Sequence, residues 1–119
     1  MDNPYLKLDV ETASPLRRVI MLYEEAILSM YKVRDSIEKN RVKEKIESIS
    51  RAQKIFGILN MSLDMEKGGE IAENLRSLYE FIENSLVKVN ASNDVRLLDD
   101  LIEIVANLKS AWEEIESKI

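Results

Sequence analysis

Paired acidic side chains are the residues in this sequence whose types and spacing come nearest to catalytic chemistry. Adjacent acids occur as Glu24 with Glu25, Asp99 with Asp100, and Glu113 with Glu114. Neighbouring positions on a helix point about 100° apart, and these pairs fall on faces that we expect to be solvated, so they favour solubility over acid and base catalysis. The chain has no histidine and no cysteine, so the commonest general base and the commonest nucleophile and base pairings are missing. We predict no catalytic residue and do not expect an enzyme.

Two further kinds of site are excluded by the same reasoning. A carboxylate-bridged di-iron centre needs a Glu-x-x-His pair on each of two helices, and the chain has no histidine. The glycines of "EKGGE" lack the Lys-Ser/Thr and the preceding strand of a phosphate loop, and the flanking carboxylates would repel phosphate. The sequence therefore predicts neither a metal site nor a cofactor.

Composition predicts a single all-α domain. A chain of 119 residues is long enough for one domain, and such a domain buries roughly two thirds of the surface that its unfolded chain exposes. Only three Gly and two Pro occur, and this balance favours helices over a strand-rich sandwich.

The net charge and the absence of cysteine limit the classes of partner and the cellular compartment that we expect. The net charge of −5 argues against nucleic acid, which requires a basic excess. No apolar run approaches the roughly 20 residues of a membrane span, so we expect no membrane insertion, and the N-terminus lacks an export signal. The absence of cysteine fits a reducing compartment, which favours the cytoplasm.

Apolar residues spaced by threes and fours predict four helices joined by short connections. Ser14 and Pro15 form a helix-start signal, and we expect Asn40 to end the first helix and cap the second. The predicted helices span about 15–39, 42–64, 71–89 and 94–119. We predict an all-α fold, an antiparallel four-helix bundle over residues 14–119 with an extended N-terminal segment over residues 1–13.

The glycine pair Gly68-Gly69 stands just before the third apolar stripe. We interpret it as a tight, left-handed step between the second and third helices, with close approach of another backbone as the alternative. Either the acids before it, Asp64 and Glu66, or those after it would then lie at the positive end of the third helix.

The predicted helices carry more apolar surface than a bundle needs. A core-facing helix requires an apolar arc somewhat over 100°, whereas the fourth helix has one of roughly 200°. Its additional residues are Leu97, Leu101, Ile104, Leu108, Ala111, Trp112 and Ile115. Ile55, Ile58 and Leu59 widen the second helix in the same way, and Met21 and Leu28 lie off the main face of the first. A contiguous apolar strip on an acidic protein predicts a docking surface for another helix or another subunit.

The N-terminal segment has its own apolar pattern. Tyr5, Leu6, Leu8 and Val10 suit an extended strip laid into a groove, with a frayed terminus as the alternative.

Several of these motifs together resemble the flagellar secretion chaperone FliS family. The block "VETASPLRRVIMLYEEAI" at residues 10–27 is similar to the family's opening, and "RAQKIFGILNMSLDMEKGGEIAENLRSLY" at residues 51–79 is similar to its most distinctive part. Asn90, Asp94 and "AWEEI" follow in the family's order. Glu24 and Glu25 stand where Asp-Gly is usual, and the lead before Thr12 is shorter than in many members.

The resemblance implies a bacterial cytoplasmic type III export chaperone. It implies binding of the disordered C-terminal segment of flagellin as short helices in apolar grooves, which prevents premature polymerisation, and delivery to the flagellar export gate; other flagellar regulators remain open as partners. It also implies that the N-terminal segment covers part of this surface, with Tyr5 as the candidate gate contact. We predict client contact at Ile55, Ile58, Leu59, Leu75, Tyr79, Leu101, Leu108 and Trp112.

A different class of function also fits the apolar excess. A structural homo-oligomer or adaptor would pair the same strips between identical subunits. The residues by themselves do not choose between the two, because either partner would cover the same apolar surface.

Overall fold

A computed structural model describes residues 14–119 and confirms the all-α, four-helix prediction. The helices are α1 (Pro15–Glu38), α2 (Val42–Met61), α3 (Met65–Ser92) and α4 (Val95–Ser117). Residues 1–13 lie outside the described residues, and with them the predictions for Tyr5, Leu6, Leu8 and Val10. Within residues 14–119 no helix combines the length and apolar character that crossing a membrane requires.

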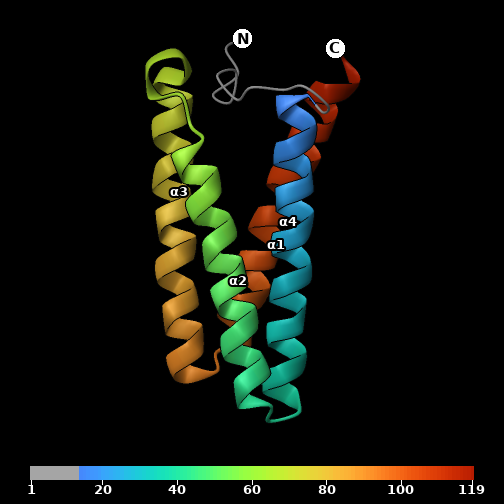
Figure 1. Ribbon diagram of the computed structural model, residues 1–119, viewed down its shortest axis with the longest axis vertical. Coiled ribbons are helices and arrows are strands. Elements are labelled where there is room, and N and C mark those ends of the chain that lie inside the picture. Colours follow the sequence, from blue (N-terminus) through green and yellow to red (C-terminus); the bar gives the residue numbers. More distant parts are fainter. Residues whose placement is uncertain (1–13) are drawn as a thin grey trace.

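The four helices form an elongated antiparallel bundle (Figure 1). Each helix packs against two neighbours: α1 lies between α2 and α4, and α3 lies between the other sides of the same two helices. The contact between α1 and α2 is the most extensive and that between α3 and α4 the least. Away from their connecting turn, α3 and α4 diverge, so that they end on opposite sides of the view.

Local signals explain where α1 and α2 begin and end. The Ser14 Oγ accepts a hydrogen bond from the Arg17 backbone N–H at 3.0 Å, and Pro15 occupies the first helical position, as predicted. Asn40 ends the first helix in a left-handed conformation with φ of 55°. The expectation that Asn40 also caps the second helix is wrong, because Arg41 holds the N-cap position and makes no side-chain capping bond.

Two consecutive residues, Asn93 and Asp94, define the turn between α3 and α4. Asn93 has φ of 56° and its N–H bonds the Val89 carbonyl at 2.8 Å, which ends α3. The Asp94 Oδ1 accepts from the Leu97 N–H at 3.0 Å and so caps α4. Both residues act within the stretch that the sequence predicted as a helix break.

The glycine pair lies inside α3, which corrects the predicted helix boundary. Asp64 caps α3 by accepting from the Lys67 N–H at 3.0 Å, and Glu66 lies in the first turn, so the acids before the glycines occupy the positive end. Gly69, with φ of 52° and ψ of −130°, then interrupts the helix. A Cβ placed on Gly69 would meet no described atom within 4 Å, so within residues 14–119 the positive φ, and not a close contact, is what favours glycine here.

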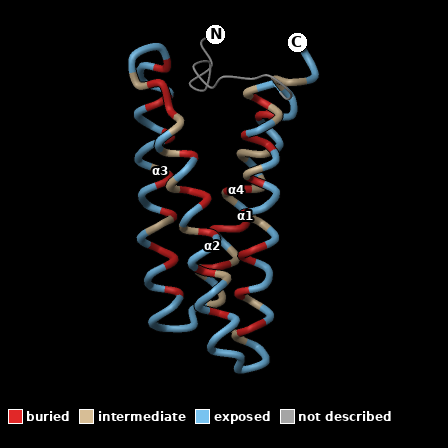
Figure 2. The backbone as a smooth tube through the Cα atoms, viewed as in Figure 1, coloured by how far each residue is buried: buried red, intermediate tan, exposed pale blue. Residues whose placement is uncertain are grey.

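One continuous core runs along the bundle, and Figure 2 shows buried positions on the inner sides of the helices. Its largest fully buried side chains are Tyr23, Tyr79, Phe56, Ile20, Met30, Leu59, Ile82, Leu86, Leu98 and Leu101. Near the lower turns, Lys45 is also buried, and its Nζ donates to the Asn90 carbonyl at 3.0 Å and to Asn93 Oδ1 at 2.8 Å. This lysine joins the start of α2 to the end of α3.

Candidate partner-binding surface

The helix α4 has one enclosed side and one half-open side. Its enclosed residues are Leu98, Leu101, Ile102, Val105 and Trp112. Leu97, Ile104, Leu108 and Ile115 pack against the core while remaining partly exposed. At about 100° per residue these four lie within a narrow arc beside the enclosed set, so they form one continuous strip along the helix.

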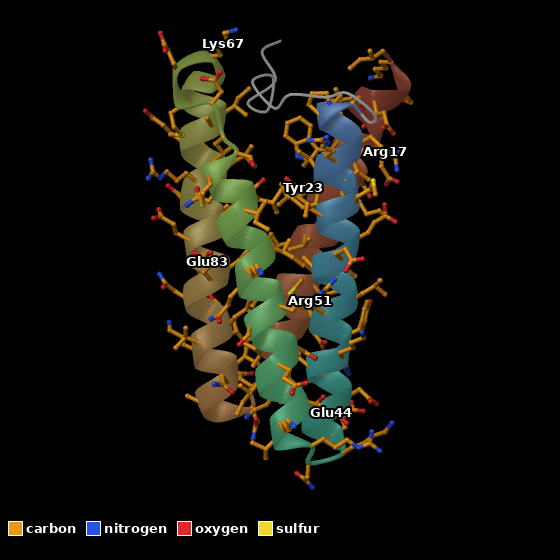
Figure 3. All side chains as sticks on the ribbon, in the orientation of Figure 1. Arg17, Tyr23, Glu44, Arg51, Lys67 and Glu83 are labelled. Atoms are coloured by element: carbon orange, nitrogen blue, oxygen red, sulfur yellow. The ribbon has the colours of Figure 1, made fainter. Side chains whose placement is uncertain are left out.

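Ion pairs close the side of α4 that faces α1. The Arg17 guanidinium makes two hydrogen bonds to the Glu116 carboxylate, one of them from Nε to Oε2 at 2.9 Å, and Arg34 pairs with Asp99. The hydrogen bond from Arg17 lowers the pKa of Glu116 below its usual value, against an opposing effect of burial, and the attraction of the two charges adds to it. These pairs join α1 to α4 near both ends, with Arg17 at the end where α1 begins (Figure 3).

The opposite side of α4 faces α3. On α3, Glu83 lies toward α2, because a Cβ placed on Gly57 of α2 would lie 3.6 Å from the Glu83 Oε1. Ile71 and Leu78 are about 120° to 140° around the helix from Glu83, on the side toward α4. Burial raises the pKa of Glu83, and the nearby Glu80 carboxylate raises it further.

We define the α3–α4 seam as the six apolar residues that border this side. Its members are Ile71 and Leu78 of α3 together with Leu97, Ile104, Leu108 and Ile115 of α4. Counting outward from the turn at Asn93 places Leu78 opposite Leu108 and Ile71 opposite Ile115. The helices α3 and α4 diverge in that direction (Figure 1), so the distance between the two backbones increases along the seam. All six keep some exposure, and Ile71 is 39% exposed.

The structure places the predicted contact residues at three depths. Leu59, Tyr79 and Leu101 are fully enclosed by the bundle's own side chains, and Ile55, Leu75 and Trp112 retain only a few per cent of their surface. Leu108 is half-buried on the seam, and Ile58 is exposed on the outer side of α2. Of the eight, therefore, only Leu108 and Ile58 present substantial surface while the helices keep this arrangement.

Two of the predicted residues belong to a buried polar cluster instead. The Trp112 Nε1 donates to the Tyr23 hydroxyl at 2.8 Å, and this hydroxyl lies 2.6 Å from the Tyr79 hydroxyl. The Tyr79 ring also packs against Phe56, with 5.9 Å between ring centroids. Buried hydroxyl and indole groups require hydrogen-bond partners, and here these three side chains provide partners for one another. Because they come from α1, α3 and α4, the cluster links these helices across the core.

The sequence analysis did not predict client contact for Leu97, Ile104 and Ile115, although it identified them as part of the excess apolar surface of the fourth helix. All three lie in the apolar arc of α4 that exceeds the needs of a core. They lie farther from the centre of the buried face than Leu101 and Trp112 do, and so remain more accessible.

A second apolar hollow, the α1–α2 groove, lies on a different side of the bundle. Its lining residues are Arg18, Met21, Leu22 and Glu25 of α1 with Ile58 and Ser62 of α2. It has a volume of about 390 Å³. The Arg51 Nη2 donates to the Glu25 Oε2 at 2.7 Å and crosses from α2 to α1 (Figure 3).

Metal binding finds no support in this part of the chain. Among residues 14–119, acidic side chains do not gather in any group of three that would hold a metal ion. A further hollow of about 360 Å³ between α1 and α2 is lined by polar and charged side chains, unlike the apolar seam and groove. Its lining residues are Lys32, Asp35, Ser36, Glu44, Glu47 and Ser48.

Comparison with known proteins gives one consistent family. The family model described as flagellar protein FliS matches residues 1–119. The flagellar secretion chaperone FliS of Vibrio cholerae is 37% identical over 115 residues, covering 93% of this chain and 85% of that protein. FliSB of Pseudomonas aeruginosa is 36% identical, covering 92% and 87%, and FliS of Salmonella typhimurium is 34% identical, covering 96% and 88%.

A solved structure supports the fold independently. The crystal structure of a flagellar chaperone from bacteria superposes with a TM-score of 0.85 at 18% identity, covering 97% of this chain and 94% of that one. At this identity the likeness concerns the fold alone.

Proposed function

The chain belongs to the FliS family of flagellar proteins, and on that premise we propose that it binds the disordered C-terminal segment of flagellin. Family membership makes it a flagellar secretion chaperone and not an enzyme. In the proposed function, it acts in the bacterial cytoplasm, prevents flagellin from polymerising prematurely and delivers it to the flagellar export gate.

The half-exposed seam is the observation that carries this proposal. A disordered segment with an apolar stripe buries that stripe only against another apolar surface. In the cytoplasm the competing surface is a second flagellin molecule. Leu97, Ile104, Leu108 and Ile115 provide a strip at helical spacing for the segment to occupy, and each of the four side chains is only partly buried.

The energetics suit a complex that must later come apart. A segment that orders on binding gives up about 2 to 5 kcal/mol of the interaction energy in lost chain entropy. A shallow seam that extends along α4 compensates through area, and the segment can be released one turn at a time. An enclosed pocket would hold its ligand against such stepwise release.

Substitution on the seam tests the proposal. We expect Leu108→Glu to weaken binding of a flagellin C-terminal peptide at least about tenfold, because a carboxylate would be buried unpaired against the peptide's apolar stripe. Isothermal titration calorimetry measures the affinity, and a peptide with its apolar residues replaced by serine serves as the negative control. Ser110→Glu adds the same charge to an exposed position on another side of α4 and should bind as the wild type does.

Unchanged binding by a folded Leu108→Glu variant would contradict the use of the seam. Absence of binding by the wild type would contradict the choice of flagellin as client. The second candidate function is a homo-oligomer that pairs the seam with itself. Light scattering at micromolar concentration distinguishes it from the proposed chaperone, because it measures the mass of the free protein. A monomer that forms a one-to-one complex with the peptide excludes it.

The N-terminal segment is part of the same proposal. We propose that residues 1–13 act as a lid, through Leu6, Leu8 and Val10, and that Tyr5 contacts the export gate. The support is the alternating apolar pattern in the sequence. Deletion of residues 1–13 should tighten peptide binding, and unchanged affinity would exclude the lid. Tyr5→Ala should reduce export of flagellin without altering peptide affinity.

A further inference from the structure

We propose that Tyr23 and Tyr79 form a strut across the bundle, which holds α3 away from α4 and so keeps the α3–α4 seam accessible to its client. The strut is this pair of side chains, whose hydroxyl oxygens lie 2.6 Å apart. The inference rests on the proposed function, because the seam is the surface that we propose for the flagellin segment. Tyr79 and Trp112 then act on client binding as positioning residues, without touching the client.

The two tyrosines come from helices that do not pack against each other. Within residues 14–119, α1 and α3 each pack against α2 and α4, so α1 and α3 stand on a diagonal of the bundle. Tyr23 and Tyr79 are both fully buried, and their hydroxyls therefore meet tip to tip inside the core. Leucine is shorter than tyrosine, so a pair of leucines would not span the same diagonal.

The hydroxyl of Tyr23 also holds α4. The Trp112 Nε1 donates to this hydroxyl at 2.8 Å, so α3 and α4 are both hydrogen-bonded to one atom of α1. Trp112 lies four residues after Leu108, on the same face of α4, and Tyr79 directly follows Leu78. The cluster therefore lies at the part of the seam where Leu78 is opposite Leu108.

The apolar residues of the seam favour a movement of α3 toward α4. All six keep some exposure, and burying them against one another would remove apolar surface from water. Because α1 packs directly against α4, such a movement also shortens the diagonal between α1 and α3. The strut occupies this diagonal with two rigid rings, so it opposes the movement.

The hydroxyl contact fixes the length of the strut in both directions. A distance of 2.6 Å is at the short end of the range for O–H···O bonds, so closer approach of the two oxygens is repulsive. Moving them apart would break a hydrogen bond between buried groups, which is costly in an apolar core. The contact between α3 and α4 is itself the least extensive in the bundle, so the strut has a large share in setting their separation.

Distances between nitroxide labels in the free protein test the strut in the absence of any client. The chain has no cysteine, so Ser77→Cys and Ser110→Cys place one label at an exposed position of α3 and one at an exposed position of α4. Electron paramagnetic resonance then measures the separation of the two helices. We expect Tyr79→Leu to shift this separation to shorter values, because the shorter side chain lets α3 approach α4.

Two control variants separate the strut from a general loss of core packing. Met30 is fully buried on α1 outside the strut, so Met30→Ala should destabilise the fold without changing the label separation. Tyr31→Phe removes a hydroxyl from an exposed tyrosine of α1 and should match the wild type in every measurement. Urea unfolding followed by circular dichroism shows which variants are folded and how stable each one is.

Peptide binding tests whether the separation matters for the client. We expect Tyr79→Leu to bind the flagellin C-terminal peptide at least about tenfold more weakly, because only a minor population keeps the seam accessible. Tyr79→Phe keeps the ring and removes only the hydroxyl, so its affinity should fall by about two- to fivefold. Folded Met30→Ala should retain the wild-type affinity.

Three results would overturn the inference. They are an unchanged label separation in Tyr79→Leu, wild-type peptide affinity in that variant despite a shorter separation, and an equal loss of affinity in Met30→Ala. Should Tyr79→Leu fail to fold, Tyr79→Phe decides, and wild-type affinity in Tyr79→Phe would likewise exclude the strut. A wild type that binds no peptide would contradict the proposed function instead, while the label separation in the free protein would still test the strut.

Discussion

The side of α4 that faces α1 and the side that faces α3 differ in the contacts that they make with the neighbouring helix. Toward α1, the boundary has an ion pair near each end, made by Arg17 with Glu116 and by Arg34 with Asp99. Toward α3, no ion pair is formed within residues 14–119, the helix contact is the least extensive of the four, and the bordering apolar residues keep some exposure. One side of α4 is therefore joined to its neighbour by charges, and the other keeps partly exposed apolar side chains, which form the surface that we propose for the flagellin segment.

The two ends of α3 differ in the polar interactions that define them. At the turn that leads to α4, the buried Lys45 binds the Asn90 carbonyl and the Asn93 side chain. At its other end, Asp64 caps the start of the helix, and Gly69 then interrupts it one turn later. At that second end, Ile71 borders the seam and is 39% exposed.

The largest expected effect separates core from seam on α4 itself. Leu101→Glu should destabilise the fold by more than about 4 kcal/mol, because it places a charge in a fully enclosed position. Leu108→Glu should cost less than about 2 kcal/mol, because the half-buried carboxylate can reach water. Urea unfolding followed by circular dichroism measures both. Equal losses would mean that the seam belongs to the core, and would remove the contrast between the two sides of α4.

That pair of residues also shows what the sequence can and cannot predict. Leu101 and Leu108 lie about 20° apart around α4, so periodicity assigns them to the same edge. Leu101 lies eight residues from Asn93 at the turn and Leu108 lies fifteen residues from it, and α3 and α4 diverge with distance from that turn (Figure 1). Periodicity fixes the direction of a side chain, whereas its burial depends on the distance to the neighbouring helix. The fold class and the apolar excess were predictable for this reason, but the residues that form the open surface were not.

Helix boundaries also divide into those that local sequence predicts and those that depend on distant residues. Ser14 and Asp94 act through bonds to their near neighbours in sequence, and both stand where a helix was predicted to begin. The start of α3 was predicted too late, because glycine propensity argues against helix while the Asp64 cap holds the turn before it. Lys45 was not identified at all, because its partners lie more than forty residues away.

The next largest expected effect is at Gly69, whose conformation interrupts α3 near its N-terminal end. Gly69→Ala should destabilise the protein by about 1 to 3 kcal/mol, because residues with a side chain rarely adopt φ of 52° with ψ of −130°. Gly57→Ala is the matched control, since it lies within regular α2 with ordinary space for a Cβ, and it should stabilise by about 0.5 to 1 kcal/mol. Thermal and urea unfolding measure the opposite signs. Equal stabilisation by both would show that the Gly69 conformation is not required.

The end of α3 that Lys45 binds should be less sensitive. Lys45→Met should destabilise by about 1 kcal/mol, because it removes two hydrogen bonds and a positive charge from the C-terminal end of the helix. Lys43→Met, at an exposed position of α2, should change stability very little. Hydrogen exchange adds a local measurement, since the amides at the end of α3 should exchange faster in Lys45→Met. Unchanged exchange there would mean that the lysine does not hold this end.

The smallest effect contrasts the α1–α4 boundary with the α2-facing side of α3, because the pH dependence of stability has opposite signs at Glu116 and Glu83. Because Arg17 lowers the pKa of Glu116 in the folded state, its ion pair stabilises above the unfolded value of about 4.3, and this stabilisation is lost as the pH falls through the folded value. Glu116→Gln should therefore be less stable than the wild type at neutral pH, with a difference that vanishes in acid. The pKa of Glu83 is raised by burial, so its ionised form disfavours folding. Glu83→Gln should be slightly more stable at neutral pH, and this gain should also vanish below about pH 4.3. Urea unfolding between about pH 3 and pH 7 measures both curves, and differences of the same sign would show that the α1 and α3 sides of the bundle do not differ in this way.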